Sequence, residues 1–204
     1  MFALVDKSDN SITRMLSGSQ GITLDGIQHP KAIFSLWTEA ERNAINIYTV
    51  EINNSKRKNT EWYVNTNVTY SFNGSKVTGS YGDATARAHA DTLFTAQDES
   101  DGKGTEGDVK DEGLKTKLIR SIKSQAEGEL NKTDWYITRK AEKDTAIPSA
   151  VSTHRDAVRS KQAEMETAIT NASDTPALET LYTYTTQEDG STTRPLGELP
   201  TKAF

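Results

Sequence analysis

Apolar and polar positions alternate most regularly in residues 61–72, where the large apolar side chains lie mainly at even positions. Such alternation is typical of a strand with one buried face. The dipeptide Asn73-Gly74 follows, and both residues tolerate the positive φ that tight hairpin turns require. The pattern therefore predicts a β-hairpin that pairs residues 61–72 with residues 76–81.

Shorter apolar runs precede this hairpin and are separated by turn-forming residues. Residues 2–5 and 12–16 predict a second hairpin at the start of the chain. Thr38 and Glu41 have the spacing of a capping box, which predicts the start of a short helix. We therefore expect residues 1–82 to form a small β-rich domain with one short helix.

The periodicity becomes helical in the second half of the chain. Residues 111–143 predict one long helix with apolar side chains at four-residue steps: Leu114, Leu118, Ile122, Ala126 and Leu130. Pro148 suits the first turn of a second helix, because its missing amide donor is not needed there. That helix has apolar residues every seven positions, at Val151, Val158, Met165 and Ala172. With a short helix ending at residue 182, these elements predict a helical hairpin over residues 111–182.

Two segments lack a sustained apolar period. Residues 84–94 are rich in alanine and compatible with a helix, and residues 97–110 form a charged, glycine-rich run typical of a linker. Residues 83–110 are thus expected to be a short helix and a linker, and residues 183–204 an extended C-terminal arm. The expected fold class is α+β, with a small mixed β-rich N-terminal domain, a long two-helix hairpin and that arm.

The composition of this 204-residue chain makes some classes of partner unexpected. Its 24 basic and 29 acidic residues give a net charge of −5 without a basic stripe, so nucleic acid is not an expected partner. No apolar run reaches the roughly 18 residues of a membrane helix, and the N-terminus lacks a secretion-signal pattern. The absence of cysteine excludes disulfides and thiolate metal sites. We expect synthesis in the cytoplasm and no membrane contact.

The candidate chemical motifs do not meet their structural requirements. Gly102, Gly104 and Gly107 spell G-x-G-x-x-G, but no buried strand precedes them to position a dinucleotide. The acidic residues around them do not fit an EF-hand, so a solvated linker is favoured and a weak Ca²⁺ or Mg²⁺ contact is the alternative. The three histidines are isolated in sequence. We expect no catalytic, cofactor or metal site, and therefore no enzyme.

Aromatic and arginine residues gather where the two long helices are expected to meet. Trp135, Tyr136 and Arg139 lie close together on the first helix, and Arg155 and Arg159 lie one turn apart on the second. These residue types dominate interface energies, because they combine a large buried area or planar stacking with a hydrogen-bonding tip. Trp135 either anchors the corner between the helices in the protein's own core or contacts a partner.

The spacing of these residues resembles the C-terminal region of the tail-fibre-assembly-like and tail-associated proteins of bacteriophages. In that family, a helix with L-x-x-T-D-W leads through a proline-containing turn into a helix with Y-R-x-x-x-R spacing. The matching positions here are Leu130, Thr133, Asp134, Trp135, Arg139, Ile147, Pro148, Arg155 and Arg159. His154 stands where the family often has tyrosine. The opening strand and the short helix after Thr38 are also similar to that family.

The resemblance implies a structural component of a phage tail, either a baseplate, tail-tip or tail-fibre adaptor subunit, which is made in the host cytoplasm and retained in the virion. Its expected partners are other tail proteins and copies of itself. The alternative is a tail-fibre assembly chaperone that is absent from mature virions, and a carbohydrate-active or receptor-binding tip is a third, distant class. The residues expected at the partner interface are Trp135, Tyr136, Arg139, Arg155, Arg159, Arg194, Pro195 and Leu196.

Overall fold

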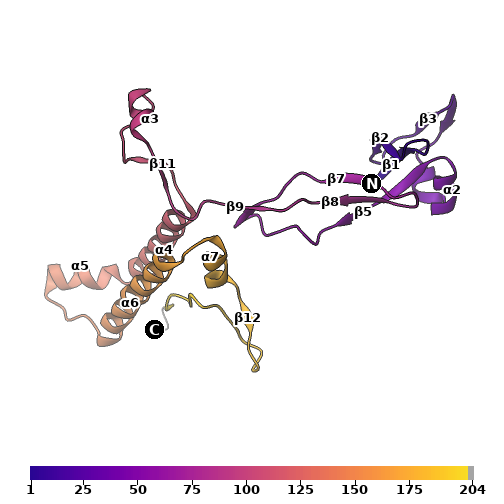
Figure 1. The fold of residues 1–204 in the computed structure, drawn as a ribbon. Helices are drawn as coiled ribbons and strands as arrows, with labels where there is room; N and C mark the ends of the chain where they lie inside the picture. The colour runs from indigo at the N-terminus through magenta and orange to yellow at the C-terminus, as the bar shows by residue number, and fades with distance from the viewer. Residues whose placement is uncertain (202–204) are drawn as a thin grey trace. The chain divides into compact units, whose positions relative to one another are not determined.

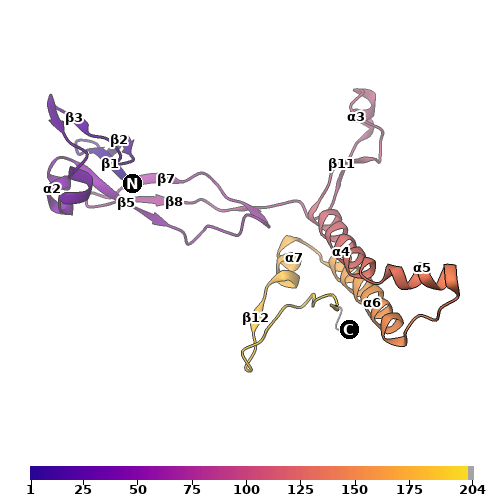
Figure 2. The same cartoon turned by 180° about the vertical axis from the view of Figure 1, so that it is seen from behind.

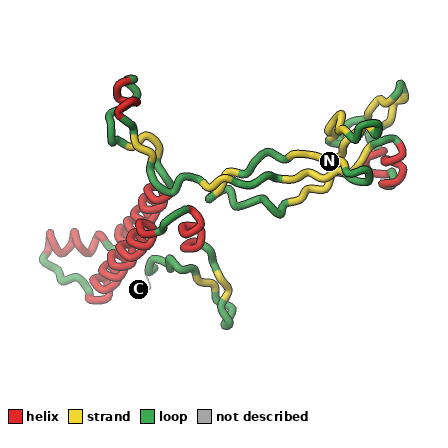
Figure 3. Tube along the Cα trace, viewed as in Figure 1, coloured by secondary structure: helices red, strands yellow, loops and turns green. Residues whose placement is uncertain are grey.

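The computed structural model describes residues 1–201 and contains both helices and strands. The chain divides into two compact units, Met1–Thr85 and Ala86–Phe204. Strands dominate the first unit and helices dominate the second (Figures 1 and 3). The predicted α+β fold class is confirmed.

A five-stranded sheet forms the centre of the first unit, with the strand order β2-β1-β5-β8-β7. Its members are β1 (Phe2–Asp6), β2 (Ser11–Leu16), β5 (Ile47–Asn53), β7 (Thr69–Phe72) and β8 (Val77–Ser80). Neighbouring strands are antiparallel except for β5 and β8, which are parallel. Both predicted hairpins are present, and Asn10 (φ 61°) and Gly74 (φ 92°) adopt the left-handed conformation in their turns.

Short elements complete the first unit: β3 (Ile22–Leu24), β4 (Ile27–His29), α1 (Ile33–Leu36) and α2 (Glu39–Ala44). The predicted capping box opens α2, because the Thr38 hydroxyl accepts from the Glu41 N–H at 3.3 Å and the Glu41 carboxylate accepts from the Thr38 N–H at 2.7 Å. Alternate residues of the strands contribute to two buried clusters, one containing Ala3, Val5, Tyr48 and Val77 and the other containing Ile22, Ile33 and Ile47.

The continuous strand predicted over residues 61–72 is wrong, because two separate strands occupy this segment. β6 (Tyr63–Val64) pairs with β9 (Thr85–Ala86), whereas β7 belongs to the main sheet. Between them, the Asn65 side chain accepts from the Lys58 N–H at 2.8 Å and donates to the Lys58 carbonyl at 2.7 Å. Side-chain bonds to the backbone compete with strand pairing, and here they interrupt it.

Two long helices lie side by side in the second unit when it is seen from either direction (Figures 1 and 2). They are α4 (Leu114–Asn131) and α6 (Ser149–Asn171). They run antiparallel, since Lys115 near the start of α4 donates to the carbonyl of Thr170 near the end of α6 at 2.8 Å. The contact buries the predicted apolar positions Ile122, Ala126, Val151, Val158 and Met165. The predicted two-helix hairpin and its apolar periods are confirmed.

The single helix predicted over residues 111–143 is wrong, because it breaks at Thr133 and continues as α5 (Asp134–Lys143). Thr133 has φ −123° and ψ 4°, outside the helical region. Its hydroxyl donates to the Leu130 carbonyl at 2.9 Å and satisfies one of the carbonyls left over at the end of α4. α5 therefore leaves the helical pair as a separate element (Figure 1).

The helix expected over residues 84–94 is absent, and the expected linker is folded. β10 (Thr92–Leu93), α3 (Ala96–Ser100) and β11 (Val109–Asp111) form a hairpin that leads into α4. Asp98 stabilises this hairpin as part of a capping box with Thr95, and it accepts from the Lys110 ammonium at 3.1 Å. The Thr95 N–H, then Lys110 and the Thr95 hydroxyl, lower the pKa of Asp98 to about 2.

The C-terminal arm follows α7 (Thr175–Tyr182) and begins as a small hairpin of β12 (Thr185–Thr186) and β13 (Thr192–Thr193). The chain then returns to its own unit, where Leu196 is buried and donates its N–H to the Leu181 carbonyl at 3.0 Å. This part of the arm is therefore anchored by the chain itself. The last residues of the predicted arm, 202–204, lie outside the described residues.

Candidate assembly interface

Within residues 86–201, α5 is the longer of the two helices of the second unit that have no buried residue, α3 being the other. The structure describes all ten of its residues, and none of them is buried. Trp135 is 51% exposed and Ile137 is 41% exposed. A helix of this length is marginal in water unless an apolar face is packed. Because its large apolar side chains remain accessible, α5 is suited to packing against another surface.

The aromatic side chains of α5 and its arginine form one stacked group. The rings of Trp135 and Tyr136 lie with their centroids 3.9 Å apart. The Arg139 guanidinium lies 4.6 Å from the Trp135 ring and 5.5 Å from the Tyr136 ring. Within residues 1–201 Arg139 forms no ion pair, and its solvent-shielded Nε has no hydrogen-bond partner. Stacking orients this cation without neutralising it, so an acidic partner group would complete its environment.

Arg155 holds the base of α5 from the neighbouring helix α6. Its Nη1 lies 2.9 Å from the Leu130 carbonyl, 2.8 Å from the Thr133 hydroxyl and 2.7 Å from a carboxylate oxygen of Asp134. Arg155 itself is only 8% exposed. A planar guanidinium with several acceptors has little freedom to reorient. The structure thus places Arg155 inside the second unit, where it positions α5 and does not offer its charge to a partner.

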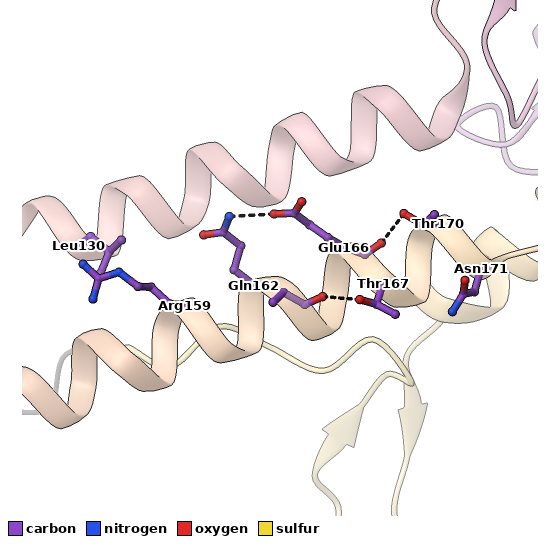
Figure 4. Close-up of a pocket in the computed structure, with 8 residues that line it drawn as sticks. Leu130, Arg159, Gln162, Glu166, Thr167, Thr170 and Asn171 are labelled. Atoms are coloured by element: carbon purple, nitrogen blue, oxygen red, sulfur yellow. Dashed lines mark hydrogen bonds between the residues drawn. The ribbon is translucent and has the colours of Figure 1, made fainter.

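Arg159 lies one turn further along α6 and lines an open groove of about 690 Å³ (Figure 4). The lining residues are Leu130 on α4 together with Arg159, Gln162, Ala163, Glu166, Thr167, Thr170 and Asn171 on α6. Gln162 donates to Glu166 at 2.8 Å, and Lys123 lies 3.4 Å from the same carboxylate. Most of the lining side chains are polar, and the Glu166 carboxylate is already bonded to Gln162 and Lys123 of the same chain. The groove therefore lies open at the surface along α6, with Leu130 of α4 on its other side.

The predicted residues of the arm form a separate cluster. Arg194 lies over the Tyr182 ring at 5.1 Å and the Tyr184 ring at 5.2 Å, and it donates to the Gly197 carbonyl and the Glu198 carboxylate. Leu196 is buried, whereas Pro195 is exposed. These contacts fasten the arm to its own unit. Of these three residues, only Pro195 has an exposed side chain.

The structure thus sorts the eight predicted interface residues by what they contact. Trp135, Tyr136 and Arg139 form the stacked group on α5, in which Trp135 is exposed and the other two are half-buried, and Arg159 lines the groove along α6. Arg155, Arg194 and Leu196 make contacts within the chain, and Pro195 lies at the surface. Trp135 is exposed and is not buried at the corner between the helices, and its contact with a partner stays a prediction.

Three of the exposed apolar residues that the sequence prediction does not include lie on α5 or on the β10–β11 hairpin. Ile137 lies on the side of α5 away from Trp135, and Leu93 and Val109 face each other across the β10–β11 hairpin. In the sequence these residues are isolated apolar positions in polar segments, and residues 97–110 are predicted to be a linker. Leu93 lies in the segment that is predicted to be a helix and Val109 in the predicted linker, so the sequence does not predict that they pair.

Neither a metal site nor a known relative indicates what this surface binds. Within residues 1–201, no group of three or more histidine, cysteine, aspartate or glutamate side chains has the geometry of a metal site. Every helix in that range is too short or too polar to cross a bilayer. Comparison with protein-family models, with curated proteins and with solved structures found no match.

Proposed function

We propose that this protein is a structural subunit of a bacteriophage tail that acts by binding neighbouring proteins. In this proposal it is made in the host cytoplasm and retained in the virion as part of a baseplate, tail tip or fibre adaptor. The observation that carries the proposal is α5, a fixed helix that presents a large aromatic residue, an aliphatic residue and an unpaired arginine. Aromatic and arginine side chains supply most of the binding energy at protein interfaces.

The hydrogen bonds of Arg155 to Leu130, Thr133 and Asp134 at the base of α5, here called the bracket, support this function. An exposed helix attached by a mobile hinge would lose much of its binding energy to ordering when a partner binds. Arg155 instead joins the end of α4 to the start of α5 through Leu130, Thr133 and Asp134. The helix is therefore presented in a defined direction before binding, which lowers the entropic cost of association.

The residues on which the resemblance to phage tail proteins rests meet in the same contacts. Leu130, Thr133, Asp134 and Arg155 belong to the pattern on which the resemblance rests, and they meet in this bracket. Trp135, the next residue of that pattern, is the main exposed anchor of α5. The pattern thus has a physical purpose, namely to orient a helix that carries a tryptophan.

A mass-spectrometric census of purified virions from the phage that encodes this chain tests the proposal. We expect the protein at a fixed copy number, and we expect Trp135→Ala to reduce its incorporation severalfold, because the loss of a central aromatic anchor costs about 2 kcal/mol or more of binding. Leu36→Ala is the matched control, since Leu36 is also a large exposed apolar residue but lies in the first unit. Its incorporation should be unchanged.

The outcomes separate the proposal from its alternative. Absence of the chain from intact particles, together with misassembled fibres when its gene is deleted, would contradict a virion subunit and support an assembly chaperone. Equal incorporation of the wild type and Trp135→Ala would leave a virion protein whose contacts do not involve α5.

A further inference from the structure

The hairpin formed by residues 91–112, here called the acidic hairpin, is the most negatively charged segment of the second unit. It contains eight acidic residues and two lysines, a net charge of −6. Both lysines are engaged with Asp98 or Asp101. Within residues 1–201, four exposed carboxylates of the hairpin form no ion pair: Glu99, Glu106, Asp108 and Asp111. The hairpin therefore presents uncompensated negative charge.

An apolar pair lies among these carboxylates. Leu93 and Val109 are directly opposed in the β10–β11 ladder and are 48% and 47% exposed. Opposed residues in an antiparallel pair share one face, and the register shift between Thr92 and Leu93 puts Asp111, which is opposed to Thr92, on the other face. A two-stranded ribbon on its own is only marginally stable. This face thus presents two half-exposed aliphatic side chains on a hairpin that carries exposed carboxylates.

The exposed surface of α5 has the complementary character. It combines Trp135 with the unpaired Arg139 one helical turn later on the same face, and Lys143 lies one turn further on. The carboxylate of Asp134 at the base of the helix is already paired with Arg155. Arg139, Lys143 and the exposed Glu142 give this face of α5 a net charge of +1, whereas the acidic hairpin is apolar and negative. Such complementarity steers association and fixes its register.

The two surfaces of one chain lie at opposite ends of α4. The acidic hairpin ends next to the first turn of α4, where Asp91 accepts from the Gly113 N–H and from the Thr116 hydroxyl, both at 2.7 Å. α5 follows the last turn of α4, which is 18 residues long. A helix of that length separates its ends by about 27 Å. The complementary surfaces therefore cannot meet within one chain.

We propose that the acidic hairpin of one copy of this protein docks on α5 of a second copy. The contact is heterologous, with different surfaces on its two sides, so repetition closes a ring or extends a row of subunits. Leu93 and Val109 pack against Trp135, and a hairpin carboxylate pairs with Arg139. This inference rests on the proposed assembly function, since it names one partner of the α5 surface.

Self-association of the purified full chain tests this contact. Sedimentation velocity over a range of concentrations should show assembly that weakens as salt is raised, because exposed charge pairs are screened. Arg139→Glu, or the pair Glu106→Lys with Asp108→Lys, should each weaken association by roughly tenfold or more, because like charges then face each other. Mixing the two kinds of variant should restore association between unlike chains. Leu36→Ala serves as the control, and circular dichroism checks that each variant is folded.

The result that overturns the proposal is a chain that stays monomeric, or one whose association is unaffected by both kinds of variant. Failure of the mixed variants to rescue each other would likewise reject this pairing of surfaces. A chain that is monomeric in solution but present in virions would reject the self-contact and leave the proposed function standing, with another tail protein on α5. A chain that self-associates through these residues but is absent from virions would reject the proposed function alone.

Discussion

Helices α4 and α6 differ from α5 in where their apolar side chains are used. α4 and α6 bury Ile122, Val158 and Met165 between them, whereas every residue of α5 remains at least partly exposed. Both regions are helical, polar in composition and adjacent in sequence. Burial of apolar side chains therefore stabilises the pair of α4 and α6, whereas the hydrogen bonds of Arg155 position α5.

The same comparison separates stability from recognition. Apolar area buried inside a chain adds to its free energy of unfolding, whereas apolar area left exposed contributes only when a partner covers it. Substitutions in α4 or α6 should therefore act on folding, and those in α5 should act on binding.

Identical substitutions in the two regions should differ most. Ile122→Ala removes a side chain that is 1% exposed on α4 and should lower the free energy of unfolding by about 3 kcal/mol, because it leaves a cavity against α6. Ile137→Ala, at a 41% exposed position of α5, should change it by less than about 0.5 kcal/mol. Urea unfolding followed by circular dichroism measures both. Similar losses at the two positions would show that α5 is part of the folding core.

Removal of the bracket should release α5 without unfolding the helical pair. Arg155→Met keeps much of the buried volume but removes the bonds to Thr133 and Asp134, at an expected cost of about 1 to 2 kcal/mol. Amide hydrogen exchange should become faster throughout α5 and stay slow in the centres of α4 and α6. Uniform acceleration in all three helices would mean that Arg155 supports the whole unit. Arg159→Met, at an exposed position of the same helix, is the control.

The elements that could be predicted from the sequence are those with a local or periodic cause. The hairpin turns at Asn10 and Gly74 need residues that accept a positive φ, and the capping box of Thr38 and Glu41 is complete within four positions. The seam of α4 and α6 follows from apolar spacing alone, since a helix has a fixed period.

The missed features depend on contacts between residues distant in sequence. The break at Thr133 involves Arg155, 22 residues later, and residues 128–143 otherwise have helical character. In residues 91–112 the fold depends on Asp98 and Lys110, which are charged residues in a glycine-rich run and carry no hydrophobic signal. Residue type alone singles out Trp135 as a candidate, but its exposure, the contacts of Arg155 below it and the second surface at Leu93 and Val109 required the fold.

Acid should loosen the acidic hairpin before it affects the helical pair. The folded pKa of Asp98 is lowered from 3.8 to about 2, so its contribution to stability is fully present above pH about 4 and is lost as the pH falls toward 2. Amide exchange or NMR of the Leu93 and Val109 region should report this change. Asp98→Asn should make the hairpin less ordered at neutral pH and remove its dependence on acid. A hairpin that keeps its order at pH 2 would contradict this role of Asp98.

The smallest effect on stability is expected at the residue most important for binding. Trp135→Ala removes the stacking of Arg139, worth about 0.5 to 1 kcal/mol at an exposed site, but it replaces tryptophan by the strongest helix former. The two changes nearly cancel, so the free energy of unfolding should change by less than about 0.5 kcal/mol. The same variant should nevertheless abolish most self-association, since half of the tryptophan surface is available to a partner. A large loss of stability with unchanged association would reverse the division between the two helical regions and show that α5 folds the chain instead of joining it to another.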